Sequence, residues 1–137
     1  MVDKPRLDAV LANLREYVRK LRALGSASRE EFLADEDRLG HAKYLLVIAV
    51  ECCIDAAHHV IASERFRPPQ SNADSFVVLV EEGVLPSEKR EAFEQMAGFR
   101  NLLVHGYAKV DDGKVYRVLQ NNLDDFDVFA RAVARLP

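Results

Sequence analysis

Apolar residues recur along most of this chain at steps of three and four, which is the spacing of one face of an α-helix. The first such stretch covers Leu7–Leu24, and Gly25 follows at the position where a helix is expected to end. A second stretch begins after Ser28, which has Glu31 in the capping-box position, and continues to about Ser63. The pattern predicts two helices here, the second longer than the first.

Turn-forming residues divide the second half of the chain. Pro68–Asn72 indicates a loop, because proline lacks a backbone donor and disfavours helix in the residue before it. The short apolar segment Ser75–Glu82 follows, and Pro86 then opens a helix that Gly106 should end. Asp111–Gly113 indicates a turn before a last helix, which continues almost to the end of the chain. No stretch predicts a strand.

The composition agrees with one globular domain. The chain has 137 residues, of which 49% are hydrophobic and 30% charged, and this suits a single core. We therefore predict that residues 1–137 form one all-α domain, an up-down bundle of about five helices. The longest uninterrupted apolar run, Tyr44–Val50, is shorter than the roughly 20 residues of a membrane span, and the first residues lack the apolar centre of a signal peptide. We expect a cytoplasmic protein with no membrane partner.

Net charge and cysteine content limit the ways in which the chain can bind nucleic acid or form covalent bonds. The net charge of −3 gives no overall attraction to nucleic acid, so any contact with RNA needs a local basic surface. Cys52 and Cys53 are neighbours in a helical stretch, where their side chains diverge, so we expect reduced core residues and no disulfide. No serine, cysteine or glycine-rich pattern predicts a different nucleophile or a phosphate-binding loop.

The most informative segment is Arg100–Tyr107, which sets a guanidinium, an amide, an imidazole and a phenol within eight residues. Asn101 and His105 are four residues apart and share one helix face, while Arg100 lies one step round the helix. In the last turn, unpaired carbonyls and the negative end of the helix dipole favour a protonated His105. Arg100 can hold two phosphate oxygens without losing its proton, which suits charge stabilisation in phosphodiester cleavage.

This order of residues resembles the Arg-x4-His-x-Tyr signature of HEPN-domain proteins, in particular the HepT toxins that are paired with a minimal nucleotidyltransferase (MNT) antitoxin. Glu51–His58 is similar to the family's second-helix segment, and Val84–Pro86 with Met96–Phe99 is similar to the approach to its motif. The resemblance covers roughly residues 35 to 130. It implies a ribonuclease toxin that acts on RNA, in which Arg100, Asn101 and His105 match the motif and Asn101 orients the substrate or the histidine.

The chemistry of RNA cleavage adds an expectation about assembly. Cleavage without a metal needs a base for the 2′-hydroxyl, an acid for the leaving 5′-oxygen and a cation for the charge on phosphorus. One His105 cannot comfortably perform both proton transfers. We therefore expect a homodimer that brings two His105 and two Arg100 side chains into one cleft, and HEPN ribonucleases are similar in this respect. We expect no metal and no cofactor.

Tyr107 has a different expected role. It lies just beyond Gly106, and the resemblance implies that an MNT nucleotidyltransferase partner attaches AMP to it. Each AMP would add negative charge beside Arg100 and His105 and switch the site off. The alternative is a tyrosine whose ring packs in the core.

Glu51, Asp55 and His59 are spaced four apart on one predicted helix, with His58 beside them. A metal site would need a further ligand from another helix, and no strong metal-binding motif is present. We expect instead that Glu51 and Asp55 position Arg100, because carboxylates in an apolar helix need a counter-charge. For His58 and His59, a solvated position is an equal alternative.

Three functions are compatible with the residues alone. Besides the ribonuclease, the chain can be a non-catalytic subunit of a two-protein nucleotidyltransferase, in which Arg100 and His105 hold a nucleotide or the partner's substrate. It can also be a scaffold, in which Arg100 pairs with a carboxylate, Asn101 bonds the backbone and His105 caps the helix end. The resemblance favours the ribonuclease.

Overall fold

A computed structural model of the chain describes residues 1–106 and 109–137, and all regular structure in these two segments is helical. The predicted all-α class is therefore confirmed. The described residues form seven α-helices and one short 3-10 helix, so the expected number of about five was too low. These elements are α1 (Lys4–Leu24), α2 (Arg29–Ala34), α3 (Glu36–Glu64), α4 (Asn72–Glu81), η1 (Ser87–Lys89), α5 (Arg90–His105), α6 (Asp112–Asn121) and α7 (Asp124–Ala134).

The predicted long helix is broken at Asp35. The backbone of Asp35 is extended, with φ −106° and ψ 98°, and its side chain accepts a hydrogen bond from the N–H of Arg38 at 3.1 Å. Asp35 is thus the N-cap of α3. Ser28 caps α2 as predicted, since its hydroxyl oxygen accepts from the N–H of Glu31 at 3.2 Å. The apolar pattern does not reveal the break, because a capping aspartate can start a new helix within one continuous apolar stripe.

The predicted last helix is also two helices. Asp111–Gly113 does not form a separate turn: the Asp111 side chain accepts from the N–H of Gly113 at 2.9 Å and caps α6. Helix α6 ends with Asn122 as its C-cap, and α7 begins at Asp124. Three aspartates in the first turn of α7 favour a new helix start here, because they face the positive end of its dipole.

Smaller differences occur around the predicted loop and the fourth predicted helix. Helix α4 begins at Asn72, inside the predicted loop, because the Ser71 side chain accepts from the N–H of Asp74 at 3.0 Å. The helix predicted to open at Pro86 starts as the 3-10 turn η1, and regular α5 begins at Arg90.

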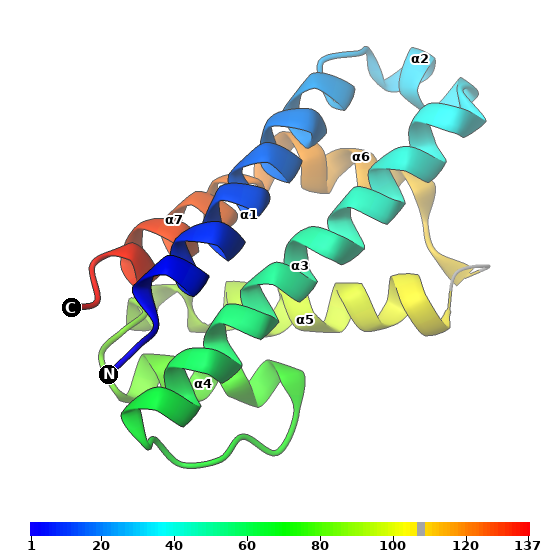
Figure 1. Ribbon diagram of the computed structural model, residues 1–137. Helices are drawn as coiled ribbons and strands as arrows, with labels where there is room; N and C mark the ends of the chain where they lie inside the picture. Colours follow the sequence, from blue (N-terminus) through cyan, green and yellow to red (C-terminus); the bar gives the residue numbers. More distant parts are fainter. Residues whose placement is uncertain (107–108) are drawn as a thin grey trace.

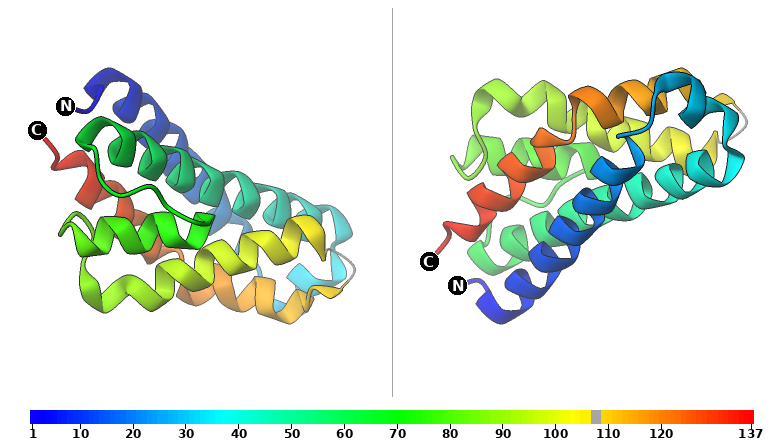
Figure 2. Two further views of the ribbon diagram at one scale, coloured as in Figure 1. Left: turned by 90° about the horizontal axis from the view of Figure 1, so that it is seen from below. Right: turned by 90° about the horizontal axis from the view of Figure 1, so that it is seen from above.

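The helices pack in two groups. Helices α1 and α3 lie side by side, with α2 joining them at one end (Figure 1). Helices α4 and α5 pack against each other and against α3, and α7 returns along α1 (Figure 2). The side chain of Lys4 donates to the carbonyls of Ala134 at 3.1 Å and Leu136 at 2.9 Å, which joins the start of α1 to the chain beyond α7.

An aromatic cluster anchors the first half of α5. Phe93 of α5 packs against Phe76 of α4 and Phe129 of α7, and the three ring centroids lie 5.7 to 6.1 Å apart. All three rings are fully buried. Ala97 and Leu103 continue the buried side of α5 toward its C-terminal end. The core therefore holds α5 along its length and fixes the direction in which its remaining side chains point.

Helix α3 is more apolar than its longest uninterrupted apolar run suggested. An 18-residue window of this helix has a mean hydropathy of 1.8, enough by length and composition alone to cross a membrane. However, 56% of that window is buried inside the fold. This is the pattern of a central helix that neighbouring helices cover on most sides.

We expect Asp35→Ala to lower the free energy of unfolding by about 1 kcal/mol, because α3 would lose its N-cap. Urea unfolding followed by circular dichroism measures this loss. Asp37→Ala is the matched control, since Asp37 is an exposed aspartate in the same first turn and removes the same charge. Equal losses in the two variants would show that charge, and not capping, starts α3.

Candidate active site

Helix α5 ends at Gly106, as predicted, but not through the backbone freedom of glycine. The N–H of Gly106 donates to the carbonyl of Leu102 at 2.7 Å, and its φ of −124° is open to any residue. A Cβ atom at Gly106 would lie 2.9 Å from Cδ1 and 3.2 Å from the carbonyl oxygen of Leu102. A side chain at position 106 would therefore require the Leu102 side chain to shift.

Arg100 reaches from α5 to α3. Its Nη2 donates to Oε1 of Glu51 at 2.8 Å, and its Nη1 donates to Oδ1 of Asn101 at 3.1 Å. The Arg100 side chain is 19% exposed, against 41% for Glu51. Its Nε is buried and has no acceptor in residues 1–106 or 109–137. The guanidinium is thus held in place with part of its donor set unused.

Asn101 and His105 lie on the exposed side of α5. They are four residues apart, so their side chains are neighbours on the helix surface. The scaffold alternative predicted that Asn101 bonds the backbone and that His105 caps carbonyls. In the structure Asn101 accepts from Arg100, and the His105 side chain makes no hydrogen bond within the described part of the chain. Only the predicted pairing of Arg100 with a carboxylate is present.

Asp55 lies apart from the Arg100–Glu51 pair. It is exposed and makes no ion pair with Arg100 in the described structure, where Glu51 alone is the carboxylate partner. Asp55 lies one helical turn further along α3 and borders a separate hollow with Arg6, His58 and His59. Of the two carboxylates expected to position Arg100, only Glu51 pairs with it, because the guanidinium meets α3 at the level of a single turn.

The histidines of α3 do not gather as metal ligands. His59 Nε2 accepts from the backbone N–H of Asp3 at 3.0 Å and lies 3.4 Å from the hydroxyl of Ser63. His58 is exposed, which matches the solvated alternative. Across residues 1–106 and 109–137, no three His, Cys, Asp or Glu side chains form a cluster that could hold a metal ion.

Both cysteines are free thiols, as predicted. Cys53 is fully buried, and burial raises its pKa well above the ordinary value. Burial also raises the pKa of the half-buried Cys52 to about 11, with smaller contributions from the carboxylates of Asp55 and Glu51. Both cysteines stay protonated near neutral pH and are poor nucleophiles.

Two large apolar side chains are exposed on the helices that carry the Arg100–Glu51 pair. Tyr44 of α3 is 62% exposed and Val104 of α5 is 43% exposed. By its spacing from the buried Phe93 and Ala97, Val104 belongs to the apolar face of α5, yet its side chain is exposed. The spacing in the sequence puts each residue on the same helix face as its member of the pair, because Tyr44 lies two helical turns before Glu51 and Val104 one turn after Arg100. Tyr107 lies outside the described residues, so its role stays a prediction.

A model of the family described as ribonuclease HepT-like matches residues 14–133. The chain belongs to the ribonuclease HepT-like family. This confirms the resemblance to HepT toxins and places Glu51, Arg100, Asn101 and His105 inside the matched region. The chain is 26% identical over 122 residues to an mRNA nuclease HepT of Shewanella oneidensis, a match that covers 87% of this chain and 89% of the relative.

Two further comparisons agree with the HepT-like assignment. A tRNA nuclease HepT of Aphanizomenon flos-aquae is 20% identical over 127 residues, covering 93% of this chain and 86% of that relative. The structure of a tri-AMPylated Shewanella oneidensis HEPN toxin in complex with an MNT antitoxin superposes with a TM-score of 0.87 at 25% identity, covering 97% of this chain and 98% of that one. The family is therefore one of ribonucleases with this helical fold.

Proposed function

We propose that residues 1–137 act as one HEPN-like domain, the metal-independent endoribonuclease toxin of a HEPN/MNT pair. The observation that carries the proposal is the Arg100 guanidinium, fixed by Glu51 and Asn101 and lying one helical step from the exposed His105 face. The relatives described as mRNA and tRNA nucleases support RNA as the substrate. The cytoplasm, where such RNA is found, is the proposed location.

In the proposed reaction, a general base removes the proton of an RNA 2′-hydroxyl, and the 2′-oxygen attacks the adjacent phosphorus. The bond from phosphorus to the 5′-oxygen breaks, and a general acid protonates that oxygen. The products carry a 2′,3′-cyclic phosphate and a 5′-hydroxyl. One His105 is the base and the second His105 of a dimer is the acid, while Arg100 stabilises the charge that develops on the phosphate oxygens. Asn101 orients the substrate.

The proposed active species is a homodimer with a shared cleft. Tyr44 and Val104 support this, because each is a large exposed apolar side chain on a helix that carries the Arg100–Glu51 pair. Light scattering during gel filtration measures the mass of the active species, and dilution tests whether activity follows dimer content. A monodisperse monomer with full cleavage activity would remove the dimer from the proposal.

The proposed off switch is transfer of AMP to Tyr107 by an MNT-type nucleotidyltransferase. The tri-AMPylated HEPN toxin of Shewanella oneidensis, in complex with its MNT antitoxin, supports a switch of this kind. Mass spectrometry after co-expression with such a partner tests it. We expect a mass increase of one or more AMP groups on peptides with Tyr107 and none in Tyr107→Phe. An unmodified Tyr107 in protein whose toxicity the partner suppresses would contradict it.

The cleavage proposal itself is tested with purified protein, shown by mass to be unmodified, and total RNA in excess chelator. Fragments with 2′,3′-cyclic or 3′-phosphate ends are the expected result. Intact RNA would overturn the ribonuclease in favour of a subunit that holds nucleotide for a nucleotidyltransferase partner.

We expect Glu51→Gln to lower cleavage about 3- to 10-fold, since a guanidinium without its ion pair is less well oriented for the phosphate. The free energy of unfolding should change by less than about 1 kcal/mol, because the pair is partly exposed. Rates on a defined RNA and urea unfolding measure the two effects. The matched control is Glu94→Gln. It removes a carboxylate that is also paired with an arginine of α5, in this case Arg90. Equal rates in both variants would exclude Glu51 as a positioning residue.

A further inference from the structure

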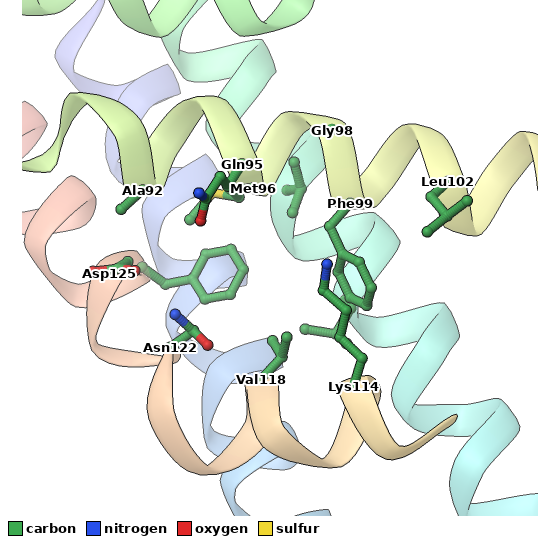
Figure 3. A pocket seen from close by; sticks show the side chains of 13 residues that line it. Ala92, Gln95, Met96, Gly98, Phe99, Leu102, Lys114, Val118, Asn122 and Asp125 are labelled. Carbon is green, nitrogen blue, oxygen red and sulfur yellow. The ribbon is translucent and has the colours of Figure 1, made fainter. Parts of the chain in front are cut away.

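A hollow between α5 and the α6–α7 pair is lined by apolar and polar side chains, none of which belongs to the proposed cleavage groups (Figure 3). Its volume is about 450 Å³, within the range of small-molecule sites. Phe99 of α5 lines the hollow on one side and Val118 of α6 on the other (Figure 3), and Phe126 of α7 also lines it. Phe126 is buried and Phe99 and Val118 are half-buried, so the walls are apolar and supported by the core.

Three polar side chains at the rim have hydrogen-bonding capacity to spare. The Asn122 carboxamide makes no hydrogen bond in the described structure, and Gln95 uses only its Nε2, which donates to Glu91 at 3.2 Å. Asp125 is 7% exposed, and Lys89 Nζ donates to its Oδ1 at 2.9 Å, while Oδ2 has no partner in the described residues. Amide and carboxylate groups together match the mixed donor and acceptor edge of a nucleobase.

A cation completes the hollow. Lys114 is exposed, and its Nζ lies 5.3 Å from the centroid of the Phe99 ring (Figure 3). It has no ion pair in the part of the chain that the structure describes, so its charge is available to a phosphate. Aromatic rings and cations together are the combination with which proteins bind single-stranded nucleic acid, and here the cation lies over the face of the ring.

The hollow borders the part of the α5 surface that carries Asn101 and His105. Gly98 and Leu102 line the hollow, Asn101 follows Gly98 by three residues, and His105 follows Leu102 by three. Residues three apart are neighbours on a helix surface. A Cβ atom at Gly98 would meet nothing within 4 Å, so the surface between the hollow and Asn101 is open. An RNA strand can therefore pass from the hollow to His105 without crossing a side chain at position 98.

We infer that this hollow binds one base of the RNA, from a nucleotide beside the cleaved bond, and so sets a base preference. The inference rests on the proposed function, which supplies the RNA. The base stacks on the Phe99 ring once Lys114 turns from the ring to a flanking phosphate, and the edge of the base bonds to Asn122, Gln95 or Asp125. A purely apolar ligand would leave these polar groups unpaired, and a lone phosphate would not use the aromatic wall.

Base preference is measured as kcat/KM on short RNAs that differ by one base around the mapped cleavage site. We expect wild type to prefer one base at one position by about 10-fold or more, and Asn122→Ala to reduce that preference to about 3-fold or less. Asn121→Ala is the matched control, because Asn121 is the adjacent exposed asparagine and does not line the hollow. Unchanged preference in Asn122→Ala, Gln95→Ala and Val118→Phe, the last of which fills the hollow, would overturn the inference.

A second measurement works whether or not the protein cleaves RNA. The chain has two methionines: Met96 lines the hollow, while Met1 does not, is 94% exposed and lies with its amino group at the carbonyl of Ser63. In protein with 13C-labelled methionine methyl groups, we expect ribonucleoside 5′-monophosphates or a 2′-O-methylated RNA to shift the Met96 signal and not that of Met1. Val118→Phe should abolish the shift. A Met96 signal that no probe moves would overturn the base site, while a shifted Met96 in a protein that leaves RNA intact would overturn the ribonuclease alone.

Discussion

Replacing His105 by alanine is expected to lower RNA cleavage by about 10²- to 10⁴-fold, the range that general acid or base catalysis typically contributes. The fold should be unaffected, because His105 is exposed and its side chain makes no hydrogen bond within the described residues. The measurement is kcat/KM on a defined RNA in excess chelator, with the thermal midpoint recorded for the same preparation.

His58→Ala is the matched control for this loss. His58 is an exposed histidine on α3, outside the Arg100 group. It should cleave at the wild-type rate. If His105→Ala also cleaves at that rate, His105 is not a catalytic residue and the proposed proton transfers have no donor on α5.

Arg100→Lys is expected to cost about 10²- to 10³-fold in kcat, comparable to the loss of one donor that stabilises an oxyanion. Lysine keeps the charge but not the planar fork. In this structure Glu51 and Asn101 bind two different nitrogens of the fork, whereas the three donors of an ammonium group sit on one nitrogen and cannot reproduce this spread. The measurements are single-turnover rates and light scattering, which detects any loss of assembly.

Arg90→Lys provides the comparison on the same helix. Arg90 pairs with Glu94 on the exposed side of α5, where a lysine can replace it. A similar fall in both variants would mean that α5 itself had been disturbed. Wild-type activity in Arg100→Lys would mean that charge alone suffices, and the fork would have no role.

The sequence predicted helices well where capping residues and apolar spacing agree, and it failed where they do not. Phe32 and Leu39 are both buried, and they lie on either side of the break at Asp35. The break does not interrupt the apolar stripe, so the stripe cannot reveal it. The same holds at Asn122, where Leu119 and Leu123 stay buried across the end of α6. A capping side chain decides the break at Asp35, whereas no side chain caps α7, whose first turn holds three aspartates instead.

For the site, residues close in sequence were predicted and residues brought together by packing were not. The order of groups in Arg100–His105 and the helix end at Gly106 follow from local rules. Arg100 pairs with Glu51 and not with Asp55 because of the position along α3 at which α5 crosses it. No local sequence pattern encodes this position. The hollow combines α5 with α6 and α7, and only the packed fold brings these helices together.

The ion pair between Arg100 and Glu51 has a consequence for selectivity. A guanidinium paired with a carboxylate binds a phosphate less strongly than a free guanidinium does, because the carboxylate repels the phosphate that the guanidinium attracts. A small molecule with a single phosphate therefore binds weakly at the Arg100–Glu51 pair. A polymer that touches the surface at several points can outweigh the repulsion at one of them. The built-in counter-ion would thus let the protein ignore the abundant free phosphates around it and respond to extended chains.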